Sequence, residues 1–282
     1  MNEQQSTVLV LGSTGKTGSR VAADLRSSGI SVRSAARSGA DVDFDWRNHD
    51  SYTPALKGVD RVYLIAPIMR LDFAADVSRF LDESEAAGVR HVTFLSAYGM
   101  EHAPPQEATR SVELDLAGRQ QLGHTILRPA WFMQNFSETF LKPVDGAIVV
   151  PTGNGSEAFI DAQDIASVAA ITLTDPASHT GAEYDLTGPE TLTVAEAAAI
   201  ISEATGQTFT HVDLDRDAWI AGAVAGGIPA EYGTVLRRLT ETIASGNGSS
   251  TTDTVEQITG TPARTFRDFA RANTAAWKEA AK

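Results

Sequence analysis

An apolar segment followed by three evenly spaced glycines lies near the start of the chain. Val8–Leu11 is apolar throughout, and Gly12, Gly15 and Gly18 follow at intervals of three residues. The apolar run predicts a buried strand, and the apolar spacing after the glycines predicts an amphipathic helix. Strand, glycine-rich turn and helix in this order are typical of a dinucleotide site, because glycine lets backbone N–H groups approach a pyrophosphate at the helix N-terminus. The expected cofactor-binding residues of the turn are Gly12, Ser13, Thr14, Gly15, Lys16, Thr17 and Gly18.

The same turn is also similar to the end of a nucleoside-triphosphate P-loop. Gly15, Lys16 and Thr17 match the last three positions of that motif. A P-loop requires another glycine five residues before the Gly-Lys pair, and Val10 occupies that position. The sequence therefore favours a dinucleotide over a nucleoside triphosphate.

Apolar, strand-like segments alternate with amphipathic, helix-like segments through the first half of the chain. Strands alternating with helices form parallel sheets with helices on both faces, so the sequence predicts an α/β fold, a doubly wound parallel sheet of the Rossmann type. We expect residues 1–131 to form the dinucleotide-binding domain, with residues 162–187 returning to it. Residues 132–282 are expected to form mainly a smaller C-terminal substrate-binding lobe. The predicted strands are 8–11, 31–37, 42–45, 61–65, 91–95, 124–128 and 183–186, and helices are predicted at 108–120, 193–205 and 230–244.

The composition narrows the class of partner. The 282 residues carry a net charge of −13, which argues against nucleic acid, because phosphate backbones require clustered Lys and Arg. No residue is cysteine, which excludes disulfides and thiolate nucleophiles and fits a reducing cytoplasm. The polar beginning of the chain shows no signal segment, no apolar run reaches membrane-spanning length, and six scattered histidines form no metal-like pair. We expect a cytoplasmic protein with a small-molecule substrate and no nucleic acid, membrane or metal partner, as a monomer or homodimer.

Arg37 and Ser38 follow the second predicted strand. Ligands of such sheets lie across the carboxyl ends of the strands, and a site for NAD usually carries an acid here that binds the 2′-hydroxyl of the ribose. Arg37 instead offers a guanidinium suited to a 2′-phosphate, with the Ser38 hydroxyl beside it. The sequence thus predicts NADP, with NADPH preferred over NADH. A solvated surface arginine is the alternative.

The other strand ends supply the remaining binding candidates. Asp45 and Trp46 close the third strand, where a carboxylate accepts from the adenine amino group and a ring flanks the base. The nicotinamide half of the cofactor is expected against Ile65, Ala66, Pro67, Ser96, Pro129 and Trp131, and the substrate against Tyr98, Trp131, Phe132 and Phe136. Trp131 and Phe132 would serve equally well as core between the two lobes.

Ser96 and Tyr98 close the fifth predicted strand, where short-chain dehydrogenases place a catalytic pair of hydroxyls. Those enzymes lower the tyrosine pKa with a lysine four residues later, so that the tyrosine passes a proton to the carbonyl oxygen. His102 stands four residues after Tyr98, and none of the five tyrosines has a lysine at that spacing. Ser96 and Tyr98 are the catalytic candidates, but the usual alcohol–ketone machinery is absent.

Two acids and one loop have an ordinary structural explanation. Glu113 and Asp164 lie on predicted helices, where an exposed face or a helix cap explains them better than catalysis. Residues 245–253 form a Gly/Ser/Thr-rich run, for which a surface loop is favoured over a lid.

Several of these segments together resemble one family, the NmrA-like branch of the atypical short-chain dehydrogenases. The similarity runs nearly end to end. Within that branch, the Gly15-Lys16-Thr17 turn and the stretch Arg128–Met133 are most similar to the festuclavine synthase/agroclavine dehydrogenase group of ergot-alkaloid reductases. Quinone oxidoreductases and triphenylmethane reductases are further similar members. The segments that carry the resemblance are Gly12–Gly18, Arg37, Leu64–Pro67, Phe94–Gly99, Thr125–Asn135, Phe159–Ile165, Tyr184–Glu190 and Thr259–Phe266.

The resemblance implies two classes of function, because the family includes reductases as well as NADP-sensing regulators that bind the dinucleotide without turnover. We expect an NADPH-dependent reductase that transfers hydride to an electron-poor planar small molecule, such as an iminium, an imine or a quinone. An iminium suits a site without a tuned acid, because hydride addition to its carbon yields a neutral amine without protonation. A quinone is also easily reduced, because its aromatising product stabilises the developing phenolate. The long C-terminal half and its aromatic residues favour the enzyme. An NADP(H)-sensing regulatory protein of the NmrA type is the alternative.

Overall fold

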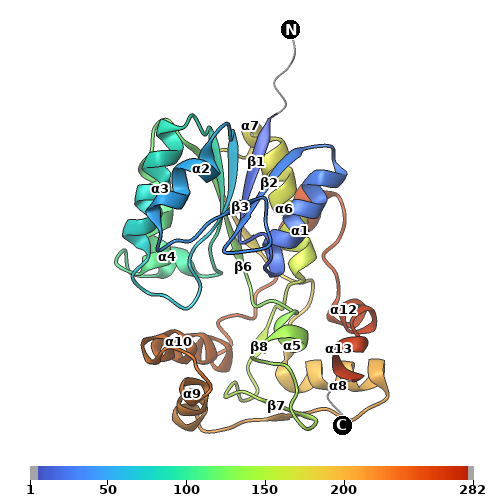
Figure 1. Cartoon of the computed structure of the whole chain (residues 1–282). Coiled ribbons are helices and arrows are strands. Elements are labelled where there is room, and N and C mark those ends of the chain that lie inside the picture. Colours follow the sequence, from blue (N-terminus) through green and yellow to red (C-terminus); the bar gives the residue numbers. More distant parts are fainter. Residues whose placement is uncertain (1–5, 279–282) are drawn as a thin grey trace. The chain divides into compact units, whose positions relative to one another are not determined.

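The computed structural model describes residues 6–278 and divides the chain into two compact units (Figure 1). The sheet unit consists of the chain up to Pro129 together with Ala162–Leu186. The second unit consists of Ala130–Asp161 together with the chain from Thr187 onward. Each unit is therefore assembled from two separate segments of the sequence.

A seven-stranded parallel sheet forms the centre of the sheet unit, in the order β3-β2-β1-β4-β5-β6-β9. Leu9 of β1 is aligned with Arg33 of β2 on one side and with Val62 of β4 on the other. The chain continues from β1 to β2 and β3 on one side and then crosses to β4 on the other side of β1. Sheets of this kind bind ligands at the point where the strand order reverses in this way. The strands are β1 (Thr7–Leu11), β2 (Ser31–Ala36), β3 (Val42–Asp43), β4 (Arg61–Ile65), β5 (His91–Leu95), β6 (Gly123–Pro129) and β9 (Ala182–Leu186).

Helices cover both faces of this sheet (Figure 1). On one face α1 (Lys16–Ser27) lies beside α6 (Ala162–Thr174), and Val21 and Leu25 of α1 are fully buried. On the other face lie α2 (Tyr52–Leu56), α3 (Ala74–Ala86) and α4 (Ala108–Gly118), which bury an apolar core with the strands. The short helices η1 (His49–Ser51), η2 (Met100–His102) and α7 (Pro176–His179) complete the unit. The predicted α/β fold with a doubly wound parallel sheet is confirmed.

The second unit is mainly helical. Its core gathers aromatic and aliphatic side chains around the fully buried Phe136, Phe266 and Trp277. Two small sheets, parallel β7–β11 and antiparallel β8–β10, were not expected from the sequence, because strands of two or three residues are too short to show a periodic pattern. The elements are α5 (Asn135–Glu138), β7 (Ala147–Val149), β8 (Ser156–Glu157), β10 (Leu192–Thr193), α8 (Val194–Thr205), β11 (Thr210–Val212), α9 (Arg216–Ala225), η3 (Ala230–Tyr232), α10 (Gly233–Ala244), α11 (Thr254–Thr259), α12 (Phe266–Ala272) and α13 (Ala275–Lys278).

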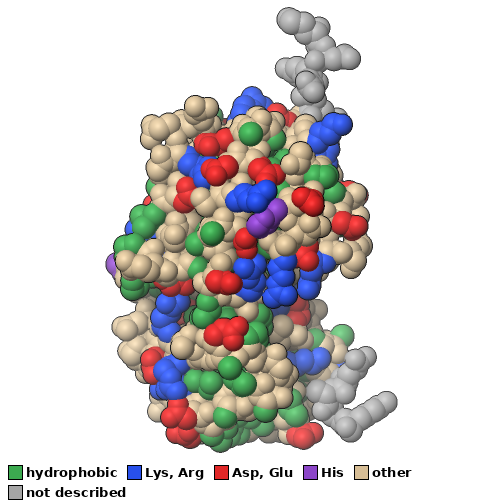
Figure 2. Space-filling view, turned by 60° about the vertical axis from the view of Figure 1, so that its left-hand side comes forward, with side chains coloured by type: hydrophobic (Ala, Val, Ile, Leu, Met, Phe, Trp, Pro, Cys, Tyr) green, Lys and Arg blue, Asp and Glu red, His purple; other side chains and the backbone are tan. Residues whose placement is uncertain are grey.

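The surface carries charges of both signs. On the face drawn in Figure 2, acidic and basic side chains are interspersed with uncharged ones. Within residues 6–278, no helix combines the length and the apolar character needed to cross a bilayer. The same part of the chain contains no group of three or more His, Asp or Glu side chains placed to hold a metal ion.

Candidate functional site

The turn between β1 and α1 is tightly closed by its own backbone. Gly12 has φ of +60°, a conformation that glycine adopts without the steric cost of a side chain. The Gly15 N–H donates to the Gly12 carbonyl at 2.8 Å, and the Ser13 N–H donates to the Ala35 carbonyl of β2 at 3.1 Å. The turn is therefore fixed to the ends of two neighbouring strands.

The other two glycines of the turn leave different amounts of room. A methyl group at Gly18 would collide with the carbonyl of Gly12 and approach that of Leu11 to 3.1 Å, so α1 packs directly on the end of β1. A methyl group at Gly15 would lie 3.2 Å from the Gly12 oxygen, a tight but not prohibitive contact. Gly18 is thus required by packing within the fold, whereas Gly15 lies at the open mouth of the turn.

The N-terminus of α1 is suited to an anion. Gly15 is its N-cap residue and offers no side-chain cap, and no acidic residue lies in the first turn. The first N–H groups of a helix lack partners within the helix, and the helix dipole favours negative charge there. The glycine cradle and this uncapped helix end therefore fit the pyrophosphate of a dinucleotide.

Arg37 and Ser38 are exposed directly after β2. Arg26 and Arg33 nearby are committed to other groups, Arg26 to Asp41 and Arg33 to the carbonyls of Ala55 and Lys57. No residue in the described part of the chain pairs with the Arg37 guanidinium. A free cation thus stands at the end of the strand that neighbours the glycine turn.

The residues predicted beside adenine and the nicotinamide ribose lie at strand ends, but Trp46 has neighbours of its own. Its ring packs edge-on against Phe44 and Phe80, with centroids 5.0 and 5.4 Å apart, and remains half-buried. The Asp45 carboxylate accepts the Arg47 N–H at 3.0 Å. At the end of β4, the Ile65 side chain lies over Gly12, 3.3 Å from where a methyl group would stand, and Ala66 and Pro67 are half-buried.

Ser96 follows β5 and belongs to a buried charged network. Its hydroxyl donates to the Glu113 carboxylate of α4 at 2.5 Å, and the Glu113 side chain is fully buried. Arg128 of β6 donates two hydrogen bonds to the same carboxylate, both at 2.9 Å, and Arg110 donates a third at 2.6 Å. Burial alone would raise the pKa of Glu113, but the hydrogen bonds from Arg128, Ser96 and Arg110 outweigh it and lower the pKa below its ordinary value. Glu113 is therefore an ionised carboxylate inside the sheet unit.

This position of Glu113 corrects the expectation of an exposed helix face or cap. Val112 and Leu116 beside it are buried, so the helical spacing did place Glu113 toward the core. Its partner Arg128 comes from the next strand, which no local pattern reveals. Arg128 also pairs with Glu183 of β9 at 2.6 Å.

Tyr98 lies two residues beyond Ser96 and is half-buried. Its backbone N–H donates to the Pro129 carbonyl at 3.0 Å, which fixes the segment to the end of β6. No residue in the described range 6–278 forms a hydrogen bond with the Tyr98 hydroxyl.

Of the aromatic residues predicted to bind substrate, Phe136 belongs to the core of the second unit. It is fully buried, and its ring lies edge-on to those of Phe159 and Phe266, each with centroids 5.0 Å away. The Phe136 ring is thus not available to a ligand in this structure, because its neighbours already surround it. Trp131 and Phe132 are only half-buried, and Trp131 packs against the same core.

Glu157 of β8 is a second buried acid that the sequence did not single out. Burial raises the pKa of its carboxyl to about 7, while the Trp131 N–H, 3.4 Å away, opposes the shift. Gly248 lies so close that a methyl group there would collide with the Glu157 carboxyl, and the Gly248 carbonyl accepts the Ala158 N–H at 3.2 Å. The loop 245–253 is thus anchored to β8 at its centre.

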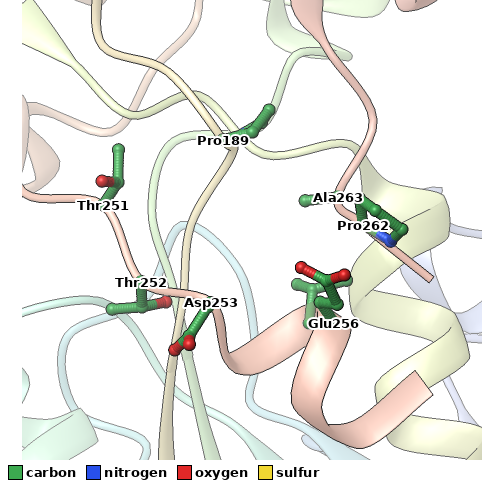
Figure 3. A pocket seen from close by; sticks show the side chains of 8 residues that line it. Pro189, Thr251, Thr252, Asp253, Glu256, Pro262 and Ala263 are labelled. Carbon is green, nitrogen blue, oxygen red and sulfur yellow. The ribbon is translucent and has the colours of Figure 1, made fainter. Parts of the chain in front are cut away.

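A cavity of about 430 Å³ lies within the second unit (Figure 3). Thr251, Thr252 and Asp253 form one side of it, and Pro262 and Ala263 stand on the other, near Glu256. None of the site residues predicted from the sequence lines this cavity.

The family of this chain follows from the similarity of its sequence to a known protein family. Residues 12–176 match a family described as NAD(P)H-binding. The chain belongs to this NAD(P)H-binding family. The matched residues begin at Gly12 and include the glycine turn, whose fit to a dinucleotide pyrophosphate agrees with the NAD(P)H-binding family.

Curated relatives of this NAD(P)H-binding protein are oxidoreductases. It is 38% identical to an uncharacterized oxidoreductase, YesF, of Bacillus subtilis strain 168, over 97% of each chain. It is 31% identical to festuclavine synthase II of Penicillium roqueforti, over 96% of this chain and 99% of the relative. An NAD(P)H azoreductase of Xenophilus azovorans is 29% identical over 96% of this chain and 99% of its own. The protein is therefore an NAD(P)H-dependent oxidoreductase.

Solved structures share the fold along nearly the whole chain. The quinone oxidoreductase QOR2 of Escherichia coli, complexed with NADPH, has a TM-score of 0.73 at 21% identity, over 94% of this chain and 99% of that one. NmrA, a negative transcriptional regulator in complex with NAD, has a TM-score of 0.76 at 17% identity, over 99% of this chain and 98% of that one.

Proposed function

We propose that the protein is an NADPH-dependent reductase of an electron-poor planar small molecule, an iminium, an imine or a quinone. The proposal rests on the hydrogen bonding of the Ser96 and Tyr98 hydroxyls, which follow β5. The Ser96 proton is engaged by Glu113, and the Tyr98 hydroxyl has no partner among the described residues. A ketone acceptor needs a positioned acid, and general acid catalysis typically contributes about 10²–10⁴-fold.

The bound nicotinamide would supply the hydride. The chain's own residues would hold the cofactor: the glycine turn and the N-terminus of α1 at the pyrophosphate, and Arg37 at the 2′-phosphate. We propose Tyr98, Trp131 and Phe132 as substrate-binding residues, acting through contact and orientation rather than proton transfer. The azoreductase relative and the quinone oxidoreductase neighbour support an acceptor of this class.

We also propose the kind of partner and the compartment in which the protein acts. A small molecule is the proposed partner, with no role for nucleic acid, because the net charge of −13 opposes phosphate backbones. The absence of cysteine fits a reducing cytoplasm.

The test measures NADPH consumption by the purified protein with a cyclic iminium, a quinone, an azo compound and a simple ketone. We expect turnover with at least one of the first three and little with the ketone. Tight NADPH binding without turnover of any acceptor would support instead the regulatory function of the NmrA type.

A further inference from the structure

Ser96 has no hydrogen-bond donor left for a ligand. Glu113 is held ionised by Arg128 and Arg110, and an ionised carboxylate only accepts, so the 2.5 Å bond between them takes the Ser96 hydroxyl proton. The Ser96 backbone N–H is also engaged, because it donates to the Leu127 carbonyl at 2.8 Å.

The Ser96 oxygen can nevertheless still accept. A hydroxyl has one proton and two lone pairs, and the bond to Glu113 uses only the proton. Ser96 keeps 8% of its surface exposed at the carboxyl end of β5, whereas Glu113 and Arg128 behind it are more deeply buried. The Ser96 hydroxyl therefore offers lone pairs, and no donor, at this strand end.

The order of the strands indicates which part of the cofactor lies here. The glycine turn follows β1 and Arg37 follows β2, so the adenosine side lies toward β2 and β3. The nicotinamide side then lies across β4 and β5, where Ser96 stands. The donor that distinguishes the nicotinamide ring itself is the N–H₂ group of its carboxamide.

We propose that the Ser96 oxygen accepts a hydrogen bond from the nicotinamide carboxamide, with Glu113 and Arg128 as positioning residues that fix its polarity. This inference rests on the proposed nicotinamide cofactor. Ser96, a catalytic and cofactor-binding candidate from the sequence, then acts as an acceptor that orients the cofactor.

The test uses three oxidised cofactors whose binding is measured by calorimetry, without any turnover. NADP⁺ and its thionicotinamide analogue both keep the N–H₂ group, whereas the 3-acetylpyridine analogue carries a methyl ketone instead. Since one neutral hydrogen bond contributes about 0.5–1.5 kcal/mol, wild-type protein should bind the first two about two- to tenfold more tightly than the third. Ser96→Ala should bring that ratio close to one.

Two further variants separate this role from a structural one. Ser84→Ala removes a fully buried serine hydroxyl, one that donates to the Phe80 carbonyl at 2.7 Å, and should leave the ratio at its wild-type value. Glu113→Gln can donate its amide N–H to Ser96, which frees the Ser96 proton to face the cofactor. This variant should therefore lower the preference or invert it in favour of the acetyl group.

The outcomes are distinguishable. Binding of all three cofactors with the same ratio in wild type and Ser96→Ala would overturn the inference while leaving the proposed function intact. A wild-type protein that binds none of the three would overturn the proposed cofactor, and the inference with it. Thermal unfolding of each variant confirms that it is folded before it is titrated.

Discussion

At the scale of single residues, two titratable side chains lack, within residues 6–278, the ion-pair partner that such groups usually have in a folded protein. Arg37 is exposed and unpaired among the described residues, and Glu157 is buried with a pKa near neutrality. For Arg37 we propose a ligand as the partner, whereas the close approach of two chain segments explains the burial of Glu157. Each leads to a measurable consequence.

Arg37→Ala should remove the preference for NADPH. A charge-assisted hydrogen bond to the 2′-phosphate contributes roughly 1.5–3 kcal/mol, so NADPH affinity should fall by about one to two orders of magnitude while NADH affinity is unchanged. Titration of both cofactors measures this. Arg90→Ala, an exposed arginine just before β5, is the matched control and should bind as wild type does. Equal NADPH and NADH affinity in the wild type would contradict the assignment.

Glu157→Gln should change how stability depends on pH. The folded pKa of about 7 lies above the ordinary 4.5, so the folded state keeps a proton that the unfolded state loses. Wild-type stability should therefore decline as pH rises from about 4.5 and level off above about 7, by about 3 kcal/mol in total. The variant lacks this loss, so relative to wild type it should be more stable at pH 8 than at pH 5.

Urea unfolding of both proteins at pH 5 and pH 8 makes this comparison, since other groups titrate alike in the two. Glu196→Gln is the control, because hydrogen bonds from the backbone and side chain of Thr193 lower the pKa of that carboxylate and its titration falls below this pH range. An identical pH dependence in wild type and Glu157→Gln would show that Glu157 is ionised in the folded state at pH 5.

At the scale of elements, the β1–turn–α1 unit joins the fold to the cofactor. The three glycines of the turn are needed for different reasons. Gly12 has a positive φ, Gly18 allows α1 to pack closely on the end of β1, and Gly15 leaves space at the opening of the turn. The substitution of valine is therefore expected to have opposite effects at Gly18 and at Gly15.

Gly18→Val should destabilise the protein, because its side chain would be forced into the Gly12 carbonyl; such overpacking typically costs about 1–3 kcal/mol. Gly15→Val should retain most of its stability, because Gly15 has extended backbone angles that valine adopts, yet it should bind NADPH at least about tenfold more weakly. Thermal unfolding and cofactor titration separate the two effects. Unchanged NADPH binding in Gly15→Val would place the cofactor elsewhere.

Elements with strong local patterns were predictable from the sequence. The strands at 61–65 and 91–95 match β4 and β5 residue for residue, because buried parallel strands are continuous apolar runs. The two-residue strands β8 and β10 were not predicted, since they depend on pairing between distant segments. The burial of Glu113 and Glu157 was missed for the same reason, because their partners lie on other elements.

At the scale of the whole molecule, the parts assigned to chemistry gather at one edge of the sheet unit. Parallel strands place their carboxyl ends together, so the glycine turn, Arg37 and Ser96 follow β1, β2 and β5 at that edge. None of the five tyrosines of the sequence is followed by a lysine four residues later. We therefore propose that orientation of cofactor and substrate, rather than acid catalysis, is the source of the rate.

The steady-state kcat of Tyr98→Phe, measured against wild type on a quinone, a cyclic iminium and a simple ketone, tests that claim most directly. We predict that kcat on the quinone or the iminium falls by less than about tenfold, well short of the loss expected from removing an essential acid. Tyr184→Phe, whose hydroxyl pairs with His179, is the control for removing a tyrosine hydroxyl. Fast ketone reduction by the wild type that collapses in Tyr98→Phe would contradict the account.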